Sequence, residues 1–213
     1  MSIISIYIKN IASFESVKMT FGDWWYEKVS VLIAKNGVGK TMALKAIYAK
    51  LKGVKPGEHD LIPEKLDIKF TEDHKPGLVW MMEENASEKK LDFELQNLFK
   101  VDQKVREKAL EIAGKLNEWK EKEYKGIRFF GDVKELSYGE KKILVIATWI
   151  ARAMDGDVII LDLPENGLHI EAQEQIIRLI SDSEKKINAI IATHSPHVLC
   201  NEEERLAETE YNC

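Results

Sequence analysis

Apolar and polar positions along the chain form patterns that are typical of strands and of helices. Residues 4–8 and 17–21 switch between apolar and polar side chains, which predicts strands with one buried face. Three other stretches are almost unbroken apolar runs, the pattern of strands covered on both faces of a parallel sheet, at residues 29–34, 157–162 and 187–192. Apolar residues recur at helical spacing between these runs, at residues 41–52, 137–153 and 171–185. This order predicts an α/β fold with a mostly parallel sheet, an antiparallel β portion near the N-terminus, and ligands at the carboxyl ends of the parallel strands.

The middle of the chain interrupts this alternation. Two further strands are predicted at residues 66–70 and 78–82, and a helical pattern follows from about residue 87 to residue 124. We interpret residues 54–128 as a β/helical lobe inserted into a single 213-residue domain, whose core consists of residues 1–53 and 129–200. Residues 201–213 are predicted to form a polar tail.

A glycine-rich turn joins the first buried strand to the helix that follows it. Residues 34–41 read Ala-Lys-Asn-Gly-Val-Gly-Lys-Thr, which matches the phosphate-loop pattern except that Ala34 replaces the usual glycine. An ordinary glycine turn before a helix is the alternative, but a buried strand before the turn and an amphipathic helix after it are the context that a phosphate loop requires.

Each residue type in this turn has a physical role toward a nucleotide triphosphate. Gly37 and Gly39 let backbone N–H groups approach the phosphates without a Cβ in the way. Lys40 would bridge the β- and γ-phosphates, and the Thr41 hydroxyl would ligate Mg²⁺. We therefore predict that ATP contacts the following residues: Asn36, Gly37, Val38, Gly39, Lys40, Thr41 and Met42.

A carboxylate ends the second buried run. Asp162 is costly to bury unless it is paired or lies near a metal, so we predict that it holds Mg²⁺ together with Thr41, a buried salt bridge being the alternative. Sites of this architecture usually place a glutamate next, but Leu163 stands there, whether natural or introduced to trap ATP. Losing a general base costs roughly 10²–10⁴-fold in rate, so slow hydrolysis is expected. Glu165 is the alternative base.

A second anion site is predicted at the start of the helix over residues 137–153. Ser137 and Glu140 form a Ser-x-x-Glu capping box, and Gly139 leaves the helix N-terminus open to a phosphate. One γ-phosphate seldom needs two such sites from one molecule, so we expect two subunits to pack head to tail, each closing the other's phosphate loop. A capped helix that binds no ligand is the alternative.

The third buried run ends in Thr-His-Ser-Pro at residues 193–196. The imidazole of His194 could hydrogen-bond the γ-phosphate and respond when that phosphate is lost. We therefore predict that His194 belongs to one catalytic group with Lys40, Asp162 and Glu165. A purely structural histidine is the alternative. The turn at residues 166–169 could meet its copy across the dimer, although His169 is equally consistent with plain surface.

Composition limits the remaining choices. The formal net charge is −5 with both signs interspersed, which argues against a nucleic-acid-binding surface over the whole molecule. A DNA contact is weakly supported because acidic residues dilute the lysines that could form it, which are Lys50, Lys52, Lys55, Lys115, Lys120, Lys122 and Lys125. No apolar run of about 18 residues occurs and the start lacks a signal-peptide pattern, so a cytoplasmic protein without membrane insertion is expected. Two cysteines are too few for a disulfide framework.

Taken together, these motifs resemble those of the ATP-binding-cassette ATPase heads of the SMC, RecF and OLD-type families. Residues 6–14 resemble their "IKNFRSF" start, with Ala12 in place of arginine, and residues 136–141 resemble their "LSxGEK" signature. Residues 162–169 resemble "DEPExxLH" except at the second position, and residues 193–196 reproduce "THSP".

This resemblance implies a P-loop NTPase of the ABC-ATPase type that sandwiches ATP and Mg²⁺ in a homodimer. Such heads do mechanical or signalling work on DNA or on a partner protein, so the leading hypothesis is an ATPase of DNA maintenance, repair or defence against foreign DNA. The glutamine that these families use to contact Mg²⁺ is missing, and Glu83 and Glu84 are weak candidates for its place.

Two alternatives remain from the sequence. The nucleotide-binding subunit of an ABC transporter is disfavoured by the "THSP" motif and by the missing glutamine. A non-hydrolysing ATP-binding module that regulates a partner protein is favoured by Leu163.

Overall fold

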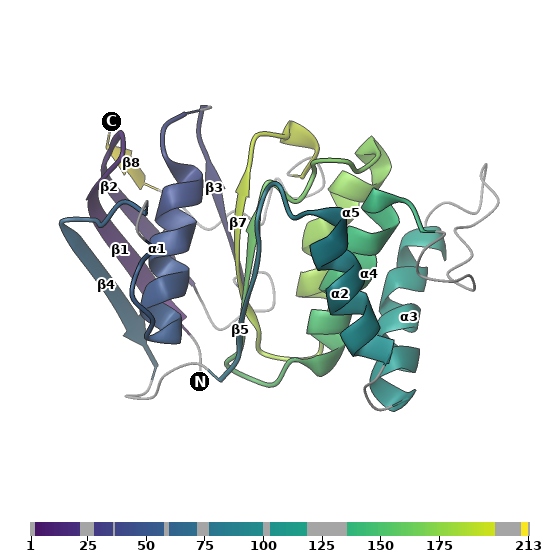
Figure 1. Cartoon of the computed structure of the whole chain (residues 1–213). Helices are drawn as coiled ribbons and strands as arrows, with labels where there is room; N and C mark the ends of the chain where they lie inside the picture. The colour runs from purple at the N-terminus through teal and green to yellow at the C-terminus, as the bar shows by residue number, and fades with distance from the viewer. Residues whose placement is uncertain are drawn as a thin grey trace.

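The structure is a computed structural model of the chain, and it describes residues 3–21, 28–35, 37–57, 60–71, 77–99, 103–118, 136–198 and 210–212. Within these residues the elements form layers, in the order antiparallel sheet, helix, parallel sheet and helices (Figure 1).

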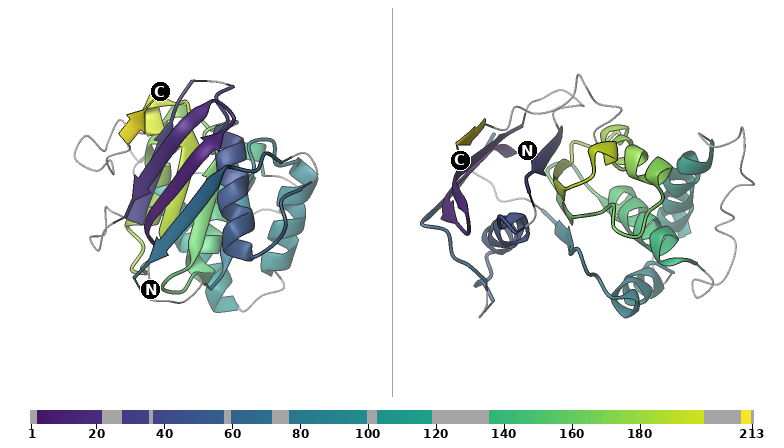
Figure 2. Two further views of the ribbon diagram at one scale, coloured as in Figure 1. Left: turned by 90° about the vertical axis from the view of Figure 1, so that its left-hand side faces the viewer. Right: turned by 90° about the horizontal axis from the view of Figure 1, so that it is seen from above.

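The antiparallel sheet has the strand order β4-β1-β2-β8 and forms one outer layer (Figure 2, left). Its strands are β1 (Ile3–Ile11), β2 (Phe14–Thr20), β4 (Lys65–Phe70) and β8 (Glu210–Asn212). Ile6 pairs with Met19 of β2 and Ile8 pairs with Val17, and all four side chains are buried. The alternating pattern read from the sequence therefore produces one apolar face, which covers the next layer.

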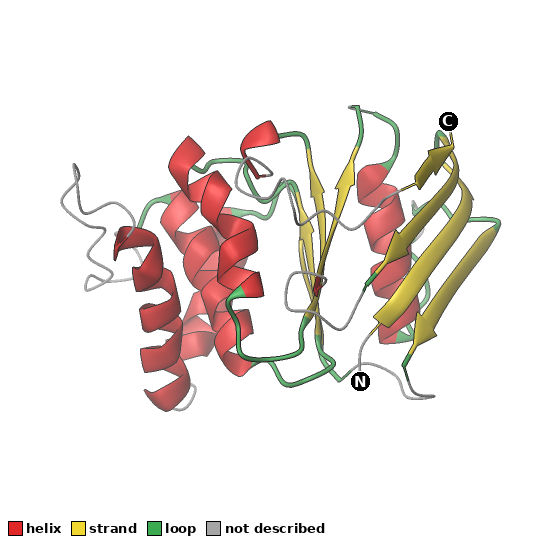
Figure 3. Ribbon diagram, turned by 180° about the vertical axis from the view of Figure 1, so that it is seen from behind, coloured by secondary structure: helices red, strands yellow, loops and turns green. Residues whose placement is uncertain are grey.

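The parallel sheet has the strand order β3-β7-β6-β5 and lies in the middle of the molecule (Figure 3). Its strands are β3 (Val29–Ile33), β5 (Val79–Met82), β6 (Val158–Asp162) and β7 (Asn188–Thr193). Successive residues of β6 enter different cores, since Ile159 packs with the outer helices and Ile160 packs with the layer beneath the antiparallel sheet. Burial on both faces explains the unbroken apolar runs.

Helices cover both faces of the parallel sheet. Helix α1 (Lys40–Lys52) fills the space between the two sheets, with Gly53 in the left-handed conformation at its end. Helices α4 (Tyr138–Arg152) and α5 (Ile170–Ser181) cover the other face, and a 3-10 turn, Pro196–Val198, follows β7. The helices α2 (Glu88–Phe99) and α3 (Gln103–Glu118) pack against α4 (Figure 1).

The fold class and element order expected from the sequence are confirmed, with three differences. The limits of the expected lobe at residues 54–128 do not follow a boundary between sheets, because β4 pairs with β1 and β5 pairs with β6. The expected polar tail contains β8, which pairs with β2. Helix α5 ends at Ser181 rather than near residue 185, because the Ser183 hydroxyl accepts the Lys185 N–H (3.2 Å) and so competes with helical bonding.

Candidate functional site

The phosphate loop connects β3 to α1 and is shaped by two glycines in the left-handed conformation. Gly37 has φ 79°, and a Cβ added there would meet no atom within 4 Å, so the loop leaves open space on this side. Gly39 has φ 106° and precedes α1, and an added Cβ would overlap the Cβ of Ala12 in the β1–β2 turn. Ala34 does not need a positive φ, which explains why it can replace glycine. These features provide the cradle that phosphates require.

The other residues of the loop anchor it. The Ser13 N–H donates to the Val38 carbonyl (3.1 Å), and Val38 and Met42 pack against the core around α1. Asn36, predicted to contact ATP, lies outside the described residues.

Lys40, at the first position of α1, points back into the loop. Its Nζ donates to the carbonyls of Ala34 (2.7 Å) and Lys35 (3.1 Å), and it lies 3.1 Å from Nδ1 of His194. Burial lowers the pKa of the Lys40 ammonium, and the carboxylates of Asp162, Glu165 and Glu84 oppose that shift. The loop therefore holds one buried cation that faces several carboxylates.

Asp162 ends β6 and is fully buried, at 0% exposure. Its two carboxylate oxygens have no hydrogen bond of standard geometry among the residues that the structure describes, although the Thr41 hydroxyl and the Glu84 backbone N–H lie close enough to favour the ionised form. The salt bridge considered from the sequence is absent from that part of the chain. Burial raises the pKa of Asp162, and the nearby Thr41 hydroxyl and Glu84 backbone oppose the shift. A buried carboxylate with free lone pairs next to a threonine hydroxyl is a donor set that suits Mg²⁺.

Leu163 occupies the position where a glutamate was expected, in a backbone conformation unusual for leucine. Its φ is 45°, its N–H donates to the Ala192 carbonyl (2.8 Å), and its side chain is 6% exposed. An apolar side chain that is packed away from solvent can neither orient nor deprotonate a water molecule.

Glu165 begins the turn at residues 165–168 and is also buried, at 7% exposure. Its Oε1 accepts hydrogen bonds from the Thr193 hydroxyl (2.7 Å), the His194 N–H (2.8 Å) and the Ser195 N–H (3.2 Å). The side chain thus contacts the end of β7 rather than an open space. We refer to residues 193–195 below as the switch segment.

His194 joins the switch segment to the phosphate loop. Its Nδ1 lies 3.1 Å from the Ala34 carbonyl oxygen and 3.1 Å from the Lys40 Nζ. The sequence placed this histidine at the sheet edge beside Asp162, and the structure brings it into contact with Lys40 itself.

The start of α4 carries the expected capping box. The Ser137 hydroxyl accepts the Glu140 N–H (3.4 Å), and the Glu140 carboxylate accepts the Ser137 N–H (2.7 Å). Gly139 lies so close to the 165–168 turn that an added Cβ would be 2.6 Å from the Gly167 carbonyl oxygen. The predicted second anion site and the turn after Asp162 are therefore in van der Waals contact within one chain.

Lys142 of α4 was not singled out from the sequence, yet it lies at the centre of this contact. It is fully buried, and its Nζ donates to the carbonyls of Asn166 (2.9 Å) and Leu163 (3.5 Å) and lies 5.6 Å from the centre of the Tyr138 ring. Burial lowers the pKa of Lys142 to about 8, and Glu165, Asp162 and Glu84 oppose this shift. All residues from 141 to 150 are buried, so this lysine lies inside the protein.

The buried charge of Lys142 predicts a pH-dependent stability. Below about pH 8 both folded and unfolded chains carry the proton, whereas between about 8 and the ordinary value of 10.5 only the unfolded chain keeps it. The free energy of unfolding should therefore rise with pH across this window, by about 3 kcal/mol at 1.36 kcal/mol per pKa unit. Lys142→Met should remove this rise, measured by urea denaturation between pH 7.5 and 10.5 in EDTA.

Lys141→Met is the matched control for this experiment. The Lys141 ammonium forms ion pairs with Glu88 (2.6 Å) and Asp92 (2.9 Å), and hydrogen bonds to both carboxylates raise its pKa. The stability that these ion pairs contribute is lost only above pH 10.5, so Lys141→Met should be less stable than the wild type at pH 7.5. Its free energy of unfolding should still rise between about pH 8 and 10.5, because Lys142 is unchanged. An unchanged rise in Lys142→Met would contradict the assignment.

Of the two candidates for the missing glutamine, the structure places one at the site. Glu83 is exposed and pairs with Lys90 (3.3 Å). Glu84 is half-buried, and its Oε1 lies 3.4 Å from the Asn166 amide nitrogen, next to the group formed by Asp162 and Lys40.

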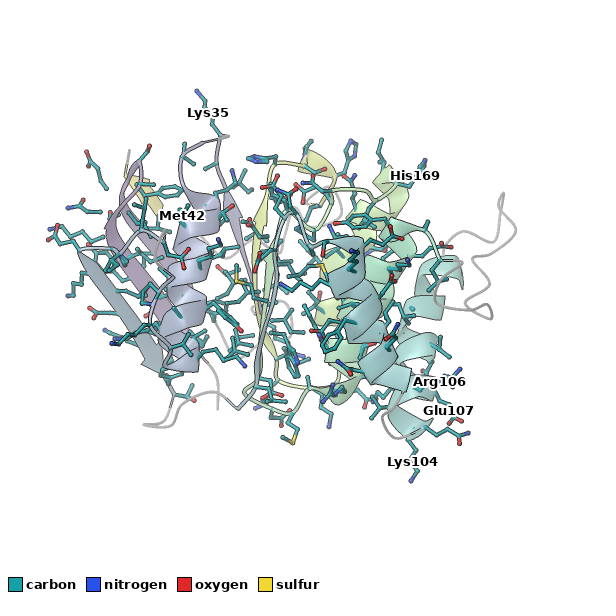
Figure 4. All side chains as sticks on the ribbon, in the orientation of Figure 1. Lys35, Met42, Lys104, Arg106, Glu107 and His169 are labelled. Atoms are coloured by element: carbon teal, nitrogen blue, oxygen red, sulfur yellow. The ribbon has the colours of Figure 1, made fainter. Side chains whose placement is uncertain are left out.

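The elements of the site gather at one end of the molecule. In Figure 4, Lys35 of the phosphate loop and His169, which precedes α5, lie toward the same end, whereas Lys104, Arg106 and Glu107 at the start of α3 lie at the other. Of the lysines considered for DNA contact, Lys50, Lys52 and Lys55 are exposed, while the remaining four side chains are outside the described part of the chain.

Comparisons with solved structures identify the fold. The SMC head domain from Thermotoga maritima matches with a TM-score of 0.59 at 15% identity over 100% of both chains. An SMC head crystallised with the C-winged helix domain of ScpA matches with a TM-score of 0.61 at 14% identity over 100% of this chain and 98% of the other. A protein from Pyrococcus furiosus titled "Putative ABC transporter (ATP-binding protein)" has a TM-score of 0.57 at 19% identity over 90% and 92%. These likenesses show that the chain has the fold of SMC head and ABC ATP-binding domains.

A match to a protein family is found at the level of sequence. The family described as "AAA domain, putative AbiEii toxin, Type IV TA system" matches residues 86–200, more than half of the chain. The chain belongs to this family of AAA domains. No curated protein sequence matches it. Among the described residues, no helix is both long and apolar enough to cross a membrane.

Proposed function

We propose that this protein is an ATP-dependent dimerising ATPase head that binds ATP with Mg²⁺ and hydrolyses it slowly. The observation that carries the proposal is the fully buried carboxylate of Asp162 beside the phosphate loop, which has no hydrogen bond of standard geometry within the described part of the chain. Burial of such a carboxylate destabilises the nucleotide-free protein, and binding of a divalent cation together with a nucleotide offsets this free-energy cost.

The chain's own residues divide the binding task. Gly37, Gly39 and the N-terminus of α1 present backbone N–H groups to the phosphates, Lys40 supplies a cation, and Thr41 and Asp162 hold the metal. When bound, Mg²⁺ would neutralise phosphate charge and orient the triphosphate. Lys40 must leave the carbonyls of Ala34 and Lys35 to reach a phosphate, so it exchanges neutral hydrogen-bond partners for a charged one.

The dimer is proposed because the sequence predicts a second anion site at a different helix. Ser137 is exposed at the start of α4, where the helix N-terminus favours negative charge. Two subunits packed head to tail would place this site of each subunit over the phosphate loop of the other, which closes a symmetric pair.

Mass measurement in solution tests this arrangement. We expect a monomer without nucleotide and a dimer with Mg-ATP by light scattering, and Ser137→Arg should prevent the dimer because it inserts a bulky side chain at the interface. Glu184→Arg is the control, since Glu184 is exposed between α5 and β7, at the end of the parallel strands opposite to Ser137. A wild type that binds ATP but stays monomeric would contradict the dimer, and no binding of ATP would contradict the whole proposal.

A partner protein or DNA is the proposed target of this ATP cycle, in DNA maintenance, repair or defence. The description of the matched family, which names a toxin–antitoxin system, supports the defence role. Salt-dependent retention of duplex DNA by the ATP-bound protein would support a DNA target, and its absence at low salt would favour a protein partner.

A non-hydrolysing regulatory module is the second candidate, and the buried side chain of Leu163 favours it. Phosphate release by the wild-type dimer, measured over hours, separates the two: slow release indicates an ATPase, and none indicates a module that is switched by binding alone.

A further inference from the structure

We propose that Glu165 is a positioning residue, which fixes His194 of the switch segment against the phosphate loop, and that it is not the general base of this site. The inference rests on the proposed ATPase function and concerns how the chain organises that site without a ligand. It is carried by the hydrogen bonds and burial of Glu165 and by the contacts of the turn that Glu165 begins.

One carboxylate oxygen of Glu165 gathers three consecutive residues of the switch segment. Oε1 accepts from the side chain of Thr193 and from the backbone N–H groups of His194 and Ser195, at 2.7, 2.8 and 3.2 Å. The Thr193 hydroxyl also accepts the Ser195 N–H (3.0 Å), which closes the segment into a tight turn. Charge-assisted bonds of this kind are roughly twice as strong as neutral ones, so the carboxylate determines the shape of the segment.

The same contacts leave Glu165 poorly placed to act as a base. The lone pairs of Oε1 face three donors within the protein. The second oxygen, Oε2, is buried and has no partner among the described residues, so neither oxygen is open to a water molecule from solvent. A general base must come within hydrogen-bond reach of the proton that it removes.

Fixing the switch segment fixes the imidazole of His194. The backbone N–H of His194 is bound by Glu165, while its Nδ1 lies 3.1 Å from the Lys40 Nζ and 3.1 Å from the Ala34 carbonyl oxygen. The two anchors, one on the backbone and one on the ring, together hold the histidine where the proposed γ-phosphate contact requires it. Loss of the backbone anchor should release the ring.

The turn that begins with Glu165 is itself held from two sides. Lys142 donates to the Asn166 carbonyl from α4, and Gln173 of α5 donates to the Leu168 carbonyl (2.9 Å). Gln173 also accepts from the Ser195 hydroxyl (2.7 Å), so a second bridge connects this turn to the switch segment. His194 is therefore positioned relative to the start of α4, where the partner's nucleotide is proposed to bind.

Substitution of Glu165 by glutamine and by alanine separates positioning from base catalysis. Glu165→Gln keeps an acceptor oxygen at the Oε1 position but cannot take a proton, whereas Glu165→Ala removes the acceptor. In nucleotide-free protein, hydrogen exchange of the His194 and Ser195 amides should accelerate at least tenfold in Glu165→Ala and by less than about threefold in Glu165→Gln, as expected when a buried amide loses its acceptor.

Nucleotide measurements on the same variants complete the test. Glu165→Ala should weaken binding of a fluorescent ATP analogue about tenfold, while Glu165→Gln, which keeps the acceptor oxygen, should weaken it by less than about threefold. A fall of about 100-fold or more in turnover for Glu165→Gln, with unchanged amide exchange and binding, would identify Glu165 as the base and overturn the proposal.

The pattern of exchange distinguishes positioning from a general loss of structure. A merely structural role would accelerate exchange throughout β7, whereas the proposal confines the change to the switch segment. If Glu165→Ala does not fold, Thr193→Val provides the milder change, since it removes one donor of the same set and should accelerate the Ser195 amide; no effect there would contradict the proposal. Amide exchange needs no nucleotide, so a failure of the proposed ATPase function would be recognised separately.

Discussion

Leu163→Glu is expected to raise ATP turnover by roughly 10²–10⁴-fold, the range that a general base contributes. Position 163 directly follows Asp162 at the carboxyl end of β6, and its backbone is fixed by the hydrogen bond to the Ala192 carbonyl. A carboxylate at this position would add the missing base, and the ammonium of Lys142, which already donates to the Leu163 carbonyl, would lessen the cost of burying it. Phosphate release under saturating Mg-ATP measures the effect.

The matched control for this gain is Leu163→Gln. Glutamine has the same shape as glutamate but cannot accept a proton, so it should leave turnover within a fewfold of the wild type. The dimer formed by Leu163→Glu should also dissociate as ATP is consumed, while that of Leu163→Gln should persist. Equal turnover in the wild type and in Leu163→Glu would show that another group already supplies the base.

Asp162→Asn is expected to stabilise the nucleotide-free protein and to abolish its response to Mg-ATP. The Asp162 carboxylate is buried without a hydrogen bond of standard geometry among the described residues, and burial raises its pKa by more than the nearby Thr41 hydroxyl lowers it. A raised pKa means that ionisation disfavours the fold, so stability is lost as the pH rises through the pKa of the folded state. A neutral amide should remove this effect and raise the free energy of unfolding by about 1–3 kcal/mol at pH 7 in EDTA.

Asp157→Asn is the control, because Asp157 is a buried carboxylate with partners. Its two oxygens accept the N–H groups of Leu78 (2.7 Å) and Met154 (2.8 Å). An amide there turns an NH₂ group toward an N–H donor, so this variant should lose stability while keeping its Mg-ATP response. Thermal melting with and without Mg-ATP compares the two. Destabilisation of Asp162→Asn in EDTA would show that the carboxylate is satisfied without a metal.

Most of the fold follows from the pattern of apolar residues, and the site follows only in part. Burial of β6 on both faces makes its sequence almost entirely apolar, so it is recognisable without a structure. The Ser137–Glu140 capping box can also be recognised from the sequence, because both of its hydrogen bonds join residues only three positions apart. Contacts between distant segments leave no such pattern. The bonds from Glu165 to the switch segment span about 30 positions, and only the structure reveals them.

Lys142 and β8 show why the remaining features could not be predicted. A lysine is almost never fully buried unless it is paired, so the sequence gives no reason to expect Lys142 in the core. Its partners are two backbone carbonyls, those of Asn166 and Leu163, which have no sequence signature. Strand β8 contains only three residues and is defined by pairing with β2, so its polar sequence does not identify it.

The close approach of Gly139 to Gly167 restricts how the protein can move. A Cβ at Gly139 would be 2.6 Å from the Gly167 carbonyl oxygen, and one at Gly167 would be 2.7 Å from the Tyr138 ring, so the backbone of each segment packs directly against the other. A change of side-chain rotamer therefore cannot let the start of α4 slide past the 165–168 turn. A neighbouring molecule that displaces the N-terminus of α4 must therefore also displace the backbone that follows Asp162.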